Sequence, residues 1–131
     1  MKMPTILIVE DEASIRKLVA VNLSARGYGV IAVDSAEQGL SQLLAHPVAL
    51  ILLDIKLPGM RGWEFLAVMA GDPRIAPNIP TIIMTASAAD AQEKAPSYPN
   101  VVKILIKPFS TEVLLQAVAD ALRRDGGPDR E

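Results

Sequence analysis

Five apolar runs of strand length alternate with segments of helical spacing, and this alternation most restricts the possible folds. The runs cover residues 5–9, 29–33, 49–53, 81–84 and 101–106. Continuous apolar runs are typical of strands buried on both faces of a sheet. Strands separated by helices form right-handed crossovers and pair in parallel. The sequence therefore predicts an α/β fold with helices on both faces of a parallel sheet.

The segments between these runs carry helix signals. Apolar residues recur at helical spacing over residues 13–25, and Arg26-Gly27 supplies a stop. Ser35 is a suitable N-cap for a second helix, because Gln38 follows three residues later in capping-box spacing. Further helices are expected over residues 63–70, 88–95 and 110–124, the last with Ser110 as its cap.

The fourth helix and the end of the chain depart from this regular pattern. Pro96 and Pro99 follow residues 88–95, and proline inside a helix removes a hydrogen bond and clashes with the preceding turn. We therefore expect a short fourth helix followed by an irregular extended stretch. Residues 125–131 (DGGPDRE) are expected to form a disordered tail, which leaves one domain over residues 1–124.

Bulk properties exclude several classes of protein. The 131 residues include 13 basic and 15 acidic side chains, and this formal charge of −2 argues against direct binding to nucleic acid. Cysteine is absent, which excludes disulfides and thiolate metal sites. The apolar run near the N-terminus is too short for a membrane helix and does not resemble a secretory signal. We expect a cytoplasmic, soluble protein with no membrane partner.

Charged and hydroxylated residues stand where the apolar strands end. They are Glu10, Asp11, Asp54, Thr85 and Lys107. Parallel strands end at one edge of a sheet, so these side chains should gather there. Three acids in one pocket repel each other, and a hard cation such as Mg²⁺ removes that cost. A lysine and a hydroxyl beside the metal would hold a phosphoryl group during transfer to a carboxylate, for which Asp54 on the central strand is the best placed.

Four motifs resemble those of one known family. They are ILIVEDE at residues 6–12, LLDIKLPGMRG at 52–62, TIIMTA at 81–86 and KPF at 107–109. In this order they resemble the CheY-like receiver domain of response regulators in two-component signal transduction, from Ile6 to about Leu122. The resemblance implies a flavodoxin-like (βα)5 fold, a doubly wound five-stranded parallel sheet with strand order 2-1-3-4-5.

The resemblance also implies a metal site. Glu10 and Asp11 match the acidic pair that positions Mg²⁺, with Asp11 as the direct ligand and Glu10 acting through water. Asp54 matches the phosphoacceptor and also a metal ligand. Lys56 matches the position whose backbone carbonyl reaches the metal.

The remaining roles concern the phosphoryl group. By resemblance, Thr85 matches the switch hydroxyl and Lys107 matches the lysine that pairs with the phosphoryl oxygens. The Lys107-Pro108 bond matches one that is cis in the family, although cis bonds are uncommon even before proline. The expected donor is a sensor histidine kinase or phosphotransfer protein, and the expected recipient of the signal is an unknown downstream protein. A weak homodimer is an open alternative. Such a domain is not an enzyme beyond promoting its own phosphorylation and dephosphorylation.

Two other functions are open at this point. A receiver-like adaptor would bind a partner without phosphorylation, but the complete set of site residues argues against it. A flavodoxin-like flavin binder would need a phosphate loop rich in serine, threonine or glycine after the first strand. The acidic residues Glu10-Asp11-Glu12 stand there instead and would repel phosphate.

Ile104 departs from the family pattern, which usually has an aromatic residue three positions before the lysine. A β-branched side chain is stiff and has no ring to turn. We therefore expect the change on phosphorylation to stay near the loops after Asp54 and Thr85, with little shift at the fourth helix and fifth strand. Trp63 is expected to cover the third helix against the sheet or to lie partly exposed, without a chemical role.

Overall fold

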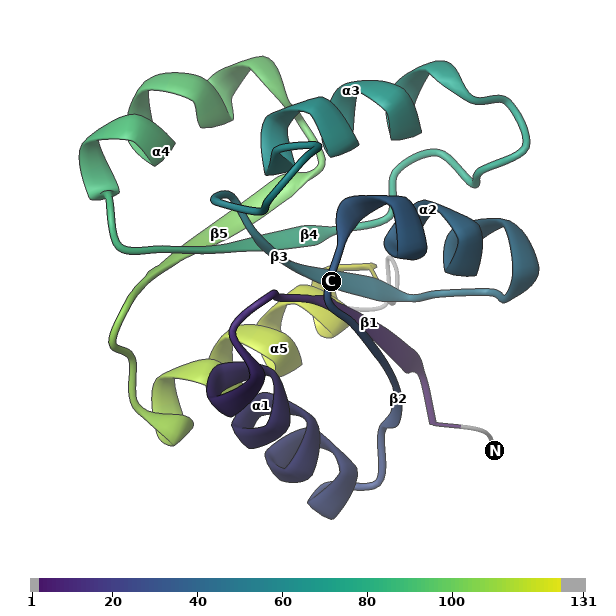
Figure 1. Cartoon of the computed structure of the whole chain (residues 1–131). Helices are drawn as coiled ribbons and strands as arrows, with labels where there is room; N and C mark the ends of the chain where they lie inside the picture. Colours follow the sequence, from purple (N-terminus) through teal and green to yellow (C-terminus); the bar gives the residue numbers. More distant parts are fainter. Residues whose placement is uncertain (1–2, 126–131) are drawn as a thin grey trace.

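The computed structural model describes residues 3–125, which form a five-stranded parallel sheet flanked by helices (Figure 1). The strands are β1 (Thr5–Val9), β2 (Gly29–Val33), β3 (Leu50–Asp54), β4 (Thr81–Thr85) and β5 (Val101–Ile106). The helices are α1 (Ala13–Ala25), α2 (Ala36–Ala45), α3 (Gly62–Gly71), α4 (Ala88–Lys94) and α5 (Thr111–Asp125), with a short 3₁₀ turn, η1 (Ala95–Ser97), after α4. The described part of the chain contains no helix long and apolar enough to cross a membrane.

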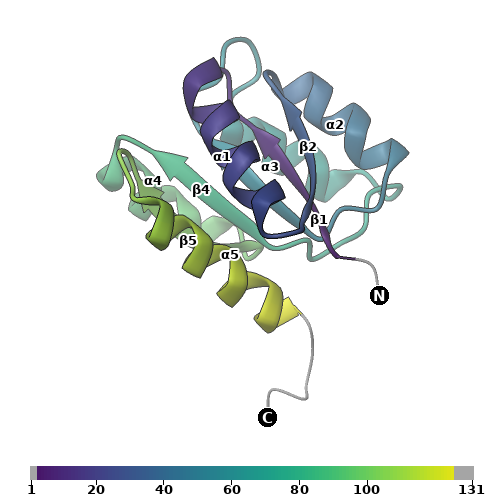
Figure 2. The same cartoon turned by 90° about the horizontal axis from the view of Figure 1, so that it is seen from below.

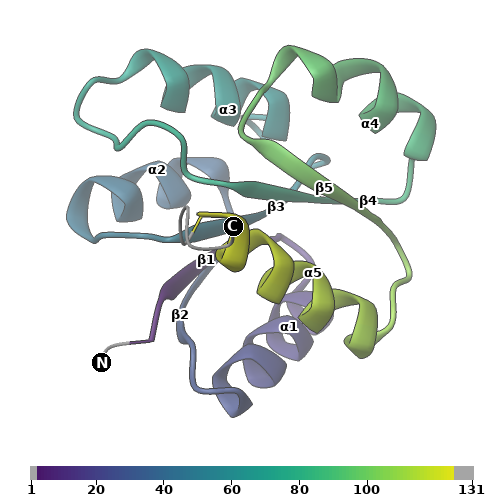
Figure 3. The ribbon, with the colours of Figure 1, turned by 180° about the vertical axis from the view of Figure 1, so that it is seen from behind.

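The strand order is β2-β1-β3-β4-β5 and all neighbours pair in parallel, which confirms the predicted fold class and order. Helices α1 and α5 cover one face of the sheet, and α2, α3 and α4 cover the other (Figures 1 and 3). The strand order reverses between β1 and β3, because β2 lies on one side of β1 whereas β3, β4 and β5 lie on its other side. Ligand sites in such sheets lie at this reversal, beyond the carboxyl ends of the strands.

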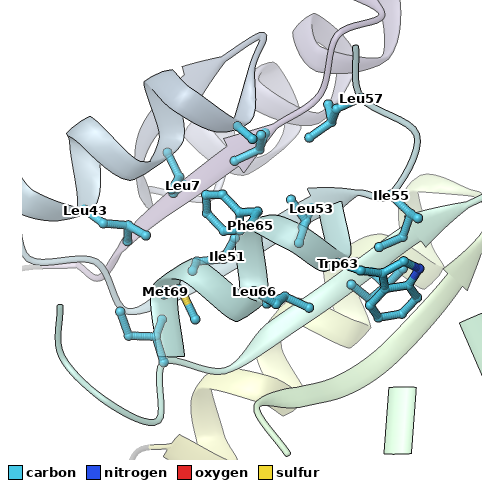
Figure 4. Close-up of a cluster of buried hydrophobic side chains, with 14 of the residues drawn as sticks. Leu7, Leu43, Ile51, Leu53, Ile55, Leu57, Trp63, Phe65, Leu66 and Met69 are labelled. Carbon is cyan, nitrogen blue, oxygen red and sulfur yellow. The ribbon is translucent and has the colours of Figure 1, made fainter. Parts of the chain in front are cut away.

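The face covered by α2 and α3 is closed by large apolar side chains. Phe65 of α3 is fully buried and projects among Leu7, Ile51 and Leu53 of the sheet (Figure 4). A Cβ at Gly39 of α2 would lie 3.0 Å from the Phe65 ring, so the absence of a side chain there allows α2 to approach the sheet. The buried ring fixes α3, and with it the loop that follows β3.

The opposite face is a second apolar layer under α1 and α5, which lie side by side in the view from below (Figure 2). Val19 and Leu23 of α1 and Val118 of α5 are fully buried there, against strand residues such as Ile8 and Leu52. Since β1 and β3 are buried on both faces, their polar end residues are held at a fixed place beyond the core.

Two predicted helix caps are confirmed. The Ser35 hydroxyl accepts a hydrogen bond from the Gln38 backbone at 3.2 Å, and the Gln38 side chain returns to the Asp34 backbone N–H at 3.3 Å. The Ser110 hydroxyl accepts a hydrogen bond from the Val113 N–H at 3.1 Å. These bonds satisfy N–H groups that a helix leaves free in its first turn.

The segment after α4 differs from the prediction. The sequence predicts an extended stretch there, whereas residues 95–97 form the 3₁₀ turn η1 with Pro96 near its start. Proline is tolerated in the first turn of a helix because its missing N–H has no partner to bond there. At the C-terminus, α5 continues to Asp125, one residue beyond the expected end of the domain, and the remaining predicted tail, residues 126–131, lies outside the described residues.

Candidate functional site

Glu10 is buried at the end of β1. Its backbone N–H donates to the Val33 carbonyl at 3.1 Å and so extends the pairing of β1 with β2. Its carboxylate accepts a hydrogen bond from the Glu12 N–H at 3.1 Å. The side chain is fully buried, whereas the neighbouring Asp11 is exposed. One acid of the pair therefore faces the interior of the site and the other faces solvent.

Asp54 is the last residue of the central strand β3 and is 5% exposed. Its Oδ1 accepts a hydrogen bond from the Lys56 backbone N–H at 3.1 Å, so the turn after the strand orients the carboxylate. The turn continues through Pro58-Gly59, where Gly59 has a φ of +73°, a conformation that favours glycine. A Pro-Gly pair is typical of such a turn.

Lys107 reaches into the same site from the end of β5. Its Nζ lies 2.9 Å from Glu10 Oε1 and 3.4 Å from Asp54 Oδ2. Its backbone N–H donates to the Thr85 carbonyl at 2.8 Å, and the bond to Pro108 is cis, as the resemblance implied. The ammonium therefore bridges two carboxylates that come from different strands.

The electrostatics of the site are those of a buried ionic cluster. Burial raises the pKa of Glu10 from its ordinary value of 4.5 to about 7, the Lys107 ammonium opposes that rise, and the charge of Asp54 adds to it. Burial also disfavours the charged form of Lys107, but its hydrogen bond to Glu10 and the two carboxylate charges outweigh burial and raise the pKa of Lys107. Lys107 thus remains a full positive charge at neutral pH.

Thr85 ends β4 and is buried, with 2% of its surface exposed. Its hydroxyl accepts a hydrogen bond from the Ser87 N–H at 3.0 Å. The Ser87 hydroxyl in turn accepts from the Asp90 N–H at 3.4 Å and caps α4. The threonine is therefore joined to the start of α4 through one intervening residue.

The three acids fit a hard divalent cation. Ligand oxygens of Glu10, Asp11 and Asp54 lie within 4.8 Å of one another. When ionised, these three carboxylates and the Lys107 ammonium carry a net charge of −2, partly in a buried setting where like charges repel strongly. Oxygen ligands and this residual charge suit Mg²⁺, which retains several waters and needs few protein ligands. The role expected for the Lys56 carbonyl remains a prediction.

Two contacts near the site were missed from sequence. Arg16 of α1 donates from Nη1 to the Glu10 carbonyl at 2.9 Å and to the Asp11 carbonyl at 3.4 Å. Trp63 of α3 is buried, stacks on Tyr98 at 5.3 Å between ring centroids, and donates from Nε1 to Asp90 at 3.2 Å. Of the two alternatives expected for Trp63, the structure shows the buried one, within the core layer under α3, but its link to α4 was not foreseen. The signal available in the sequence for this contact of Arg16 was that it is a basic residue one turn into α1.

A largely apolar groove of about 430 Å³ adjoins the acidic cluster. It is lined by residues of α1, of the loop before α5 and of the strand ends: Glu12, Ile15, Leu18, Ala86, Lys107, Pro108 and Phe109. Leu18 is 52% exposed, so this face carries apolar surface beside the carboxylates.

Comparisons with known proteins place the chain and its fold among related proteins. A family model described as "Response regulator receiver domain" matches residues 6–119. The phosphate regulon transcriptional regulatory protein PhoB of Pseudomonas aeruginosa is 34% identical over 127 residues, which are 97% of this chain and 55% of that protein. The transcriptional regulatory protein HprR of Escherichia coli is 39% identical over 121 residues, 91% of this chain and 52% of that protein.

Among solved structures, the chemotaxis response regulator CheY4 of Vibrio cholerae matches with a TM-score of 0.83 and 25% identity, covering 92% of this chain and 100% of that one. The chain spans only part of the curated relatives it matches: 55% of the length of PhoB, 52% of HprR, and between 24% and 56% among others. The similarity therefore concerns one domain of those proteins.

Proposed function

Since this chain belongs to the response regulator receiver domain family of two-component signal transduction, we propose that it is a switch controlled by phosphorylation of Asp54. The phosphoryl donor is a histidine kinase or a phosphotransfer protein. The phosphorylated form changes the affinity of this domain for a downstream protein. The observation that supports this proposal best is the placement of Asp54 at 3.4 Å from the Lys107 ammonium and within 4.8 Å of two further acids.

In the proposed transfer, a carboxylate oxygen of Asp54 forms a bond to phosphorus while the bond from phosphorus to the donor nitrogen breaks. The Lys56 N–H restricts the rotation of the Asp54 carboxylate and presents it at the end of β3. Lys107 is positioned to neutralise charge on the phosphoryl oxygens as they enter. When bound by Glu10, Asp11 and Asp54, Mg²⁺ supplies further charge neutralisation for the transferred group.

Thr85 supplies the remaining group in this proposal. Its hydroxyl has one proton to donate, and its lone pairs already accept from Ser87. A donor aimed at a phosphoryl oxygen would couple the modification to the loop before α4. The product is a mixed anhydride, whose hydrolysis returns Asp54 to its resting state, so the domain acts on itself and not on an external substrate.

The donor protein is proposed to dock over the groove beside Lys107. That groove opens next to the acidic cluster and is bordered by the exposed Leu18. A partner that covers it would bring its phosphorylated side chain to Asp54 and exclude water from the transfer. The relatives PhoB and HprR are named transcriptional regulatory proteins, so control of an output protein or output domain is the proposed use of the switch.

Phosphorylation in vitro tests this function. Acetyl phosphate with Mg²⁺ should add one base-labile phosphoryl group, detected by intact mass, and Asp54→Asn should abolish the addition. Asp34→Asn is a matched control, because Asp34 follows β2 and is exposed. Undiminished labelling of Asp54→Asn would refute the proposal. A wild-type protein that is never labelled, yet binds a partner, would favour the adaptor alternative.

A further inference from the structure

The turn between β1 and α1 carries the acidic pair and is closed by a side chain from the helix. Arg16 is half-buried and donates from Nη1 to the carbonyls of both Glu10 and Asp11, at 2.9 and 3.4 Å. Both acceptors belong to the residues that lie between the strand and the helix. One side chain therefore fixes the backbone of two residues whose carboxylates are proposed to hold Mg²⁺.

Other contacts in the described part of the chain hold this turn mainly at Glu10. The N-cap of α1, Glu12, makes no side-chain capping hydrogen bond within the described residues. Glu10 is anchored on the strand side by its own N–H to Val33, and its carboxylate is held by the Glu12 N–H at 3.1 Å and by Lys107 at 2.9 Å. Asp11 is exposed, and the Arg16 bond to its carbonyl restrains its backbone from the helix side. The direction of its short carboxylate follows its backbone closely.

From this arrangement we propose that Arg16 is a positioning residue for the divalent metal site. The inference rests on the proposed function, because it assumes that Glu10 and Asp11 bind Mg²⁺. In this role Arg16 acts through its hydrogen bonds, which hold the peptide units that carry the two carboxylates. Partners that orient metal ligands in this way typically contribute a factor of about 10–100 to metal affinity.

The charge of Arg16 and its hydrogen bonds have opposite effects on cation binding. A guanidinium near the site repels Mg²⁺, so a role through charge alone predicts tighter Mg²⁺ binding when Arg16 is neutralised. A role through positioning predicts weaker binding. Lysine keeps the charge but replaces the planar guanidinium with a point donor, so it does not reproduce the bonds of arginine to two carbonyls. For Arg16→Gln the two explanations therefore predict opposite changes in Mg²⁺ affinity. For Arg16→Lys, charge alone predicts no change in Mg²⁺ affinity, whereas positioning predicts a loss.

The experiment compares Arg16→Gln, Arg16→Lys and Lys17→Gln by Mg²⁺ titration calorimetry, without any phosphodonor. Lys17 is the adjacent exposed cation on α1, so Lys17→Gln removes the same charge without the turn contacts of Arg16. Both Arg16 variants should bind Mg²⁺ at least about tenfold more weakly than wild type, and Lys17→Gln should bind within about twofold. Urea unfolding without Mg²⁺ checks that each variant is folded.

The results separate this inference from the proposed function. If wild type binds no Mg²⁺, or Asp11→Asn binds it as tightly as wild type, the proposed metal site fails. If wild type binds Mg²⁺ and Asp11→Asn binds weakly, but folded Arg16→Lys and Arg16→Gln match or exceed wild type, the positioning role of Arg16 is refuted. If Arg16→Gln does not fold, the affinity of Arg16→Lys decides.

Discussion

Glycine at position 62 is predicted to be essential for the position of the loop that follows Asp54. Gly62 is the first residue of α3, and its N–H donates to the Ile55 carbonyl at 3.0 Å. A Cβ there would lie 2.8 Å from Ile55 Cα, 2.8 Å from Ile55 Cδ1 and 2.9 Å from the Asp54 carbonyl oxygen. Two of these atoms are backbone and cannot rotate away. Gly62→Ala must therefore move α3 or the chain that follows Asp54.

The size of the effect follows from two opposing contributions. Ordinary carbon contacts are about 3.5–4.0 Å, so the new methyl group overlaps its neighbours by more than about 0.5 Å. Overpacking of this kind costs about 1–3 kcal/mol, whereas alanine in place of glycine in a helix gains about 0.5–1 kcal/mol. We expect a net loss of about 1 kcal/mol in the free energy of unfolding, within a range of about 0–2.5 kcal/mol. Misplacement of a reacting group by about 1 Å can slow a reaction about 100-fold, so labelling of Asp54 should slow as well.

Gly71, the last residue of the same helix, provides the control. A Cβ at Gly71 would meet no described atom within 4 Å. Gly71→Ala should raise stability by about 0.4–1 kcal/mol, because it restricts the unfolded chain without a clash. Urea unfolding followed by circular dichroism measures both variants, and acetyl phosphate labelling measures the site. A Gly62→Ala protein as stable as wild type, with an unchanged labelling rate, would show that the loop yields freely and that this reasoning is wrong.

Two further predictions concern pH and α4. Because the pKa of Glu10 is about 7 without metal, Mg²⁺ must displace a proton at lower pH. Mg²⁺ affinity should therefore rise with pH up to about pH 7–8 and then level off. Stability without Mg²⁺ should fall as pH rises from about 4.5, the ordinary pKa of the carboxyl, to about 7, its pKa in the folded state, and then level off, since the folded state binds this proton more tightly. Calorimetry in buffers of different ionisation enthalpy measures the released proton. A Mg²⁺ affinity that does not change with pH would contradict the prediction that Glu10 loses a proton when Mg²⁺ binds. Asp90→Ala should lower the free energy of unfolding by about 1–3 kcal/mol and shift the fluorescence of Trp63, the only tryptophan, because it leaves the buried indole N–H without its acceptor. Asp90→Asn keeps an acceptor and should behave more like wild type. Equal stability of Asp90→Ala and wild type would show that this hydrogen bond does not hold α4 against α3.

Most of the secondary structure was predictable from the sequence, and so was the gathering of acidic and basic side chains at one edge of the sheet. Apolar runs such as residues 5–9 and 81–84 mark strands through the side chains of a few neighbouring residues. Caps such as Ser35 and Ser110 act within one helical turn. Asp54 and Lys107 could be grouped in advance because every parallel strand ends at the same edge of the sheet. The strand order came from resemblance to a family and was then confirmed by the pairing of the strands.

The sequence could not predict how deeply each charged side chain of the site is buried or which other side chains it contacts. The pairing of Lys107 with both Glu10 and Asp54 depends on the spacing of three strands and on which acid is buried. The effect of Ile104, which packs partly buried against the layer under α2 and α3, remains a prediction. A chain of hydrogen bonds from Thr85 through Ser87 to the start of α4 was not foreseen.

The sequence alone determined the helices and strands of this protein and the edge of the sheet at which its charged residues lie. The reason is that polarity patterns, caps and turns depend on a few neighbouring residues. Only the tertiary structure decided that Arg16 holds the acidic turn, that Gly62 lies against the chain after Asp54, and that Trp63 bonds to a residue 27 positions away. These contacts depend on how helices pack on the sheet. Packing is settled by the volumes and shapes of many side chains at once, and no local pattern records it.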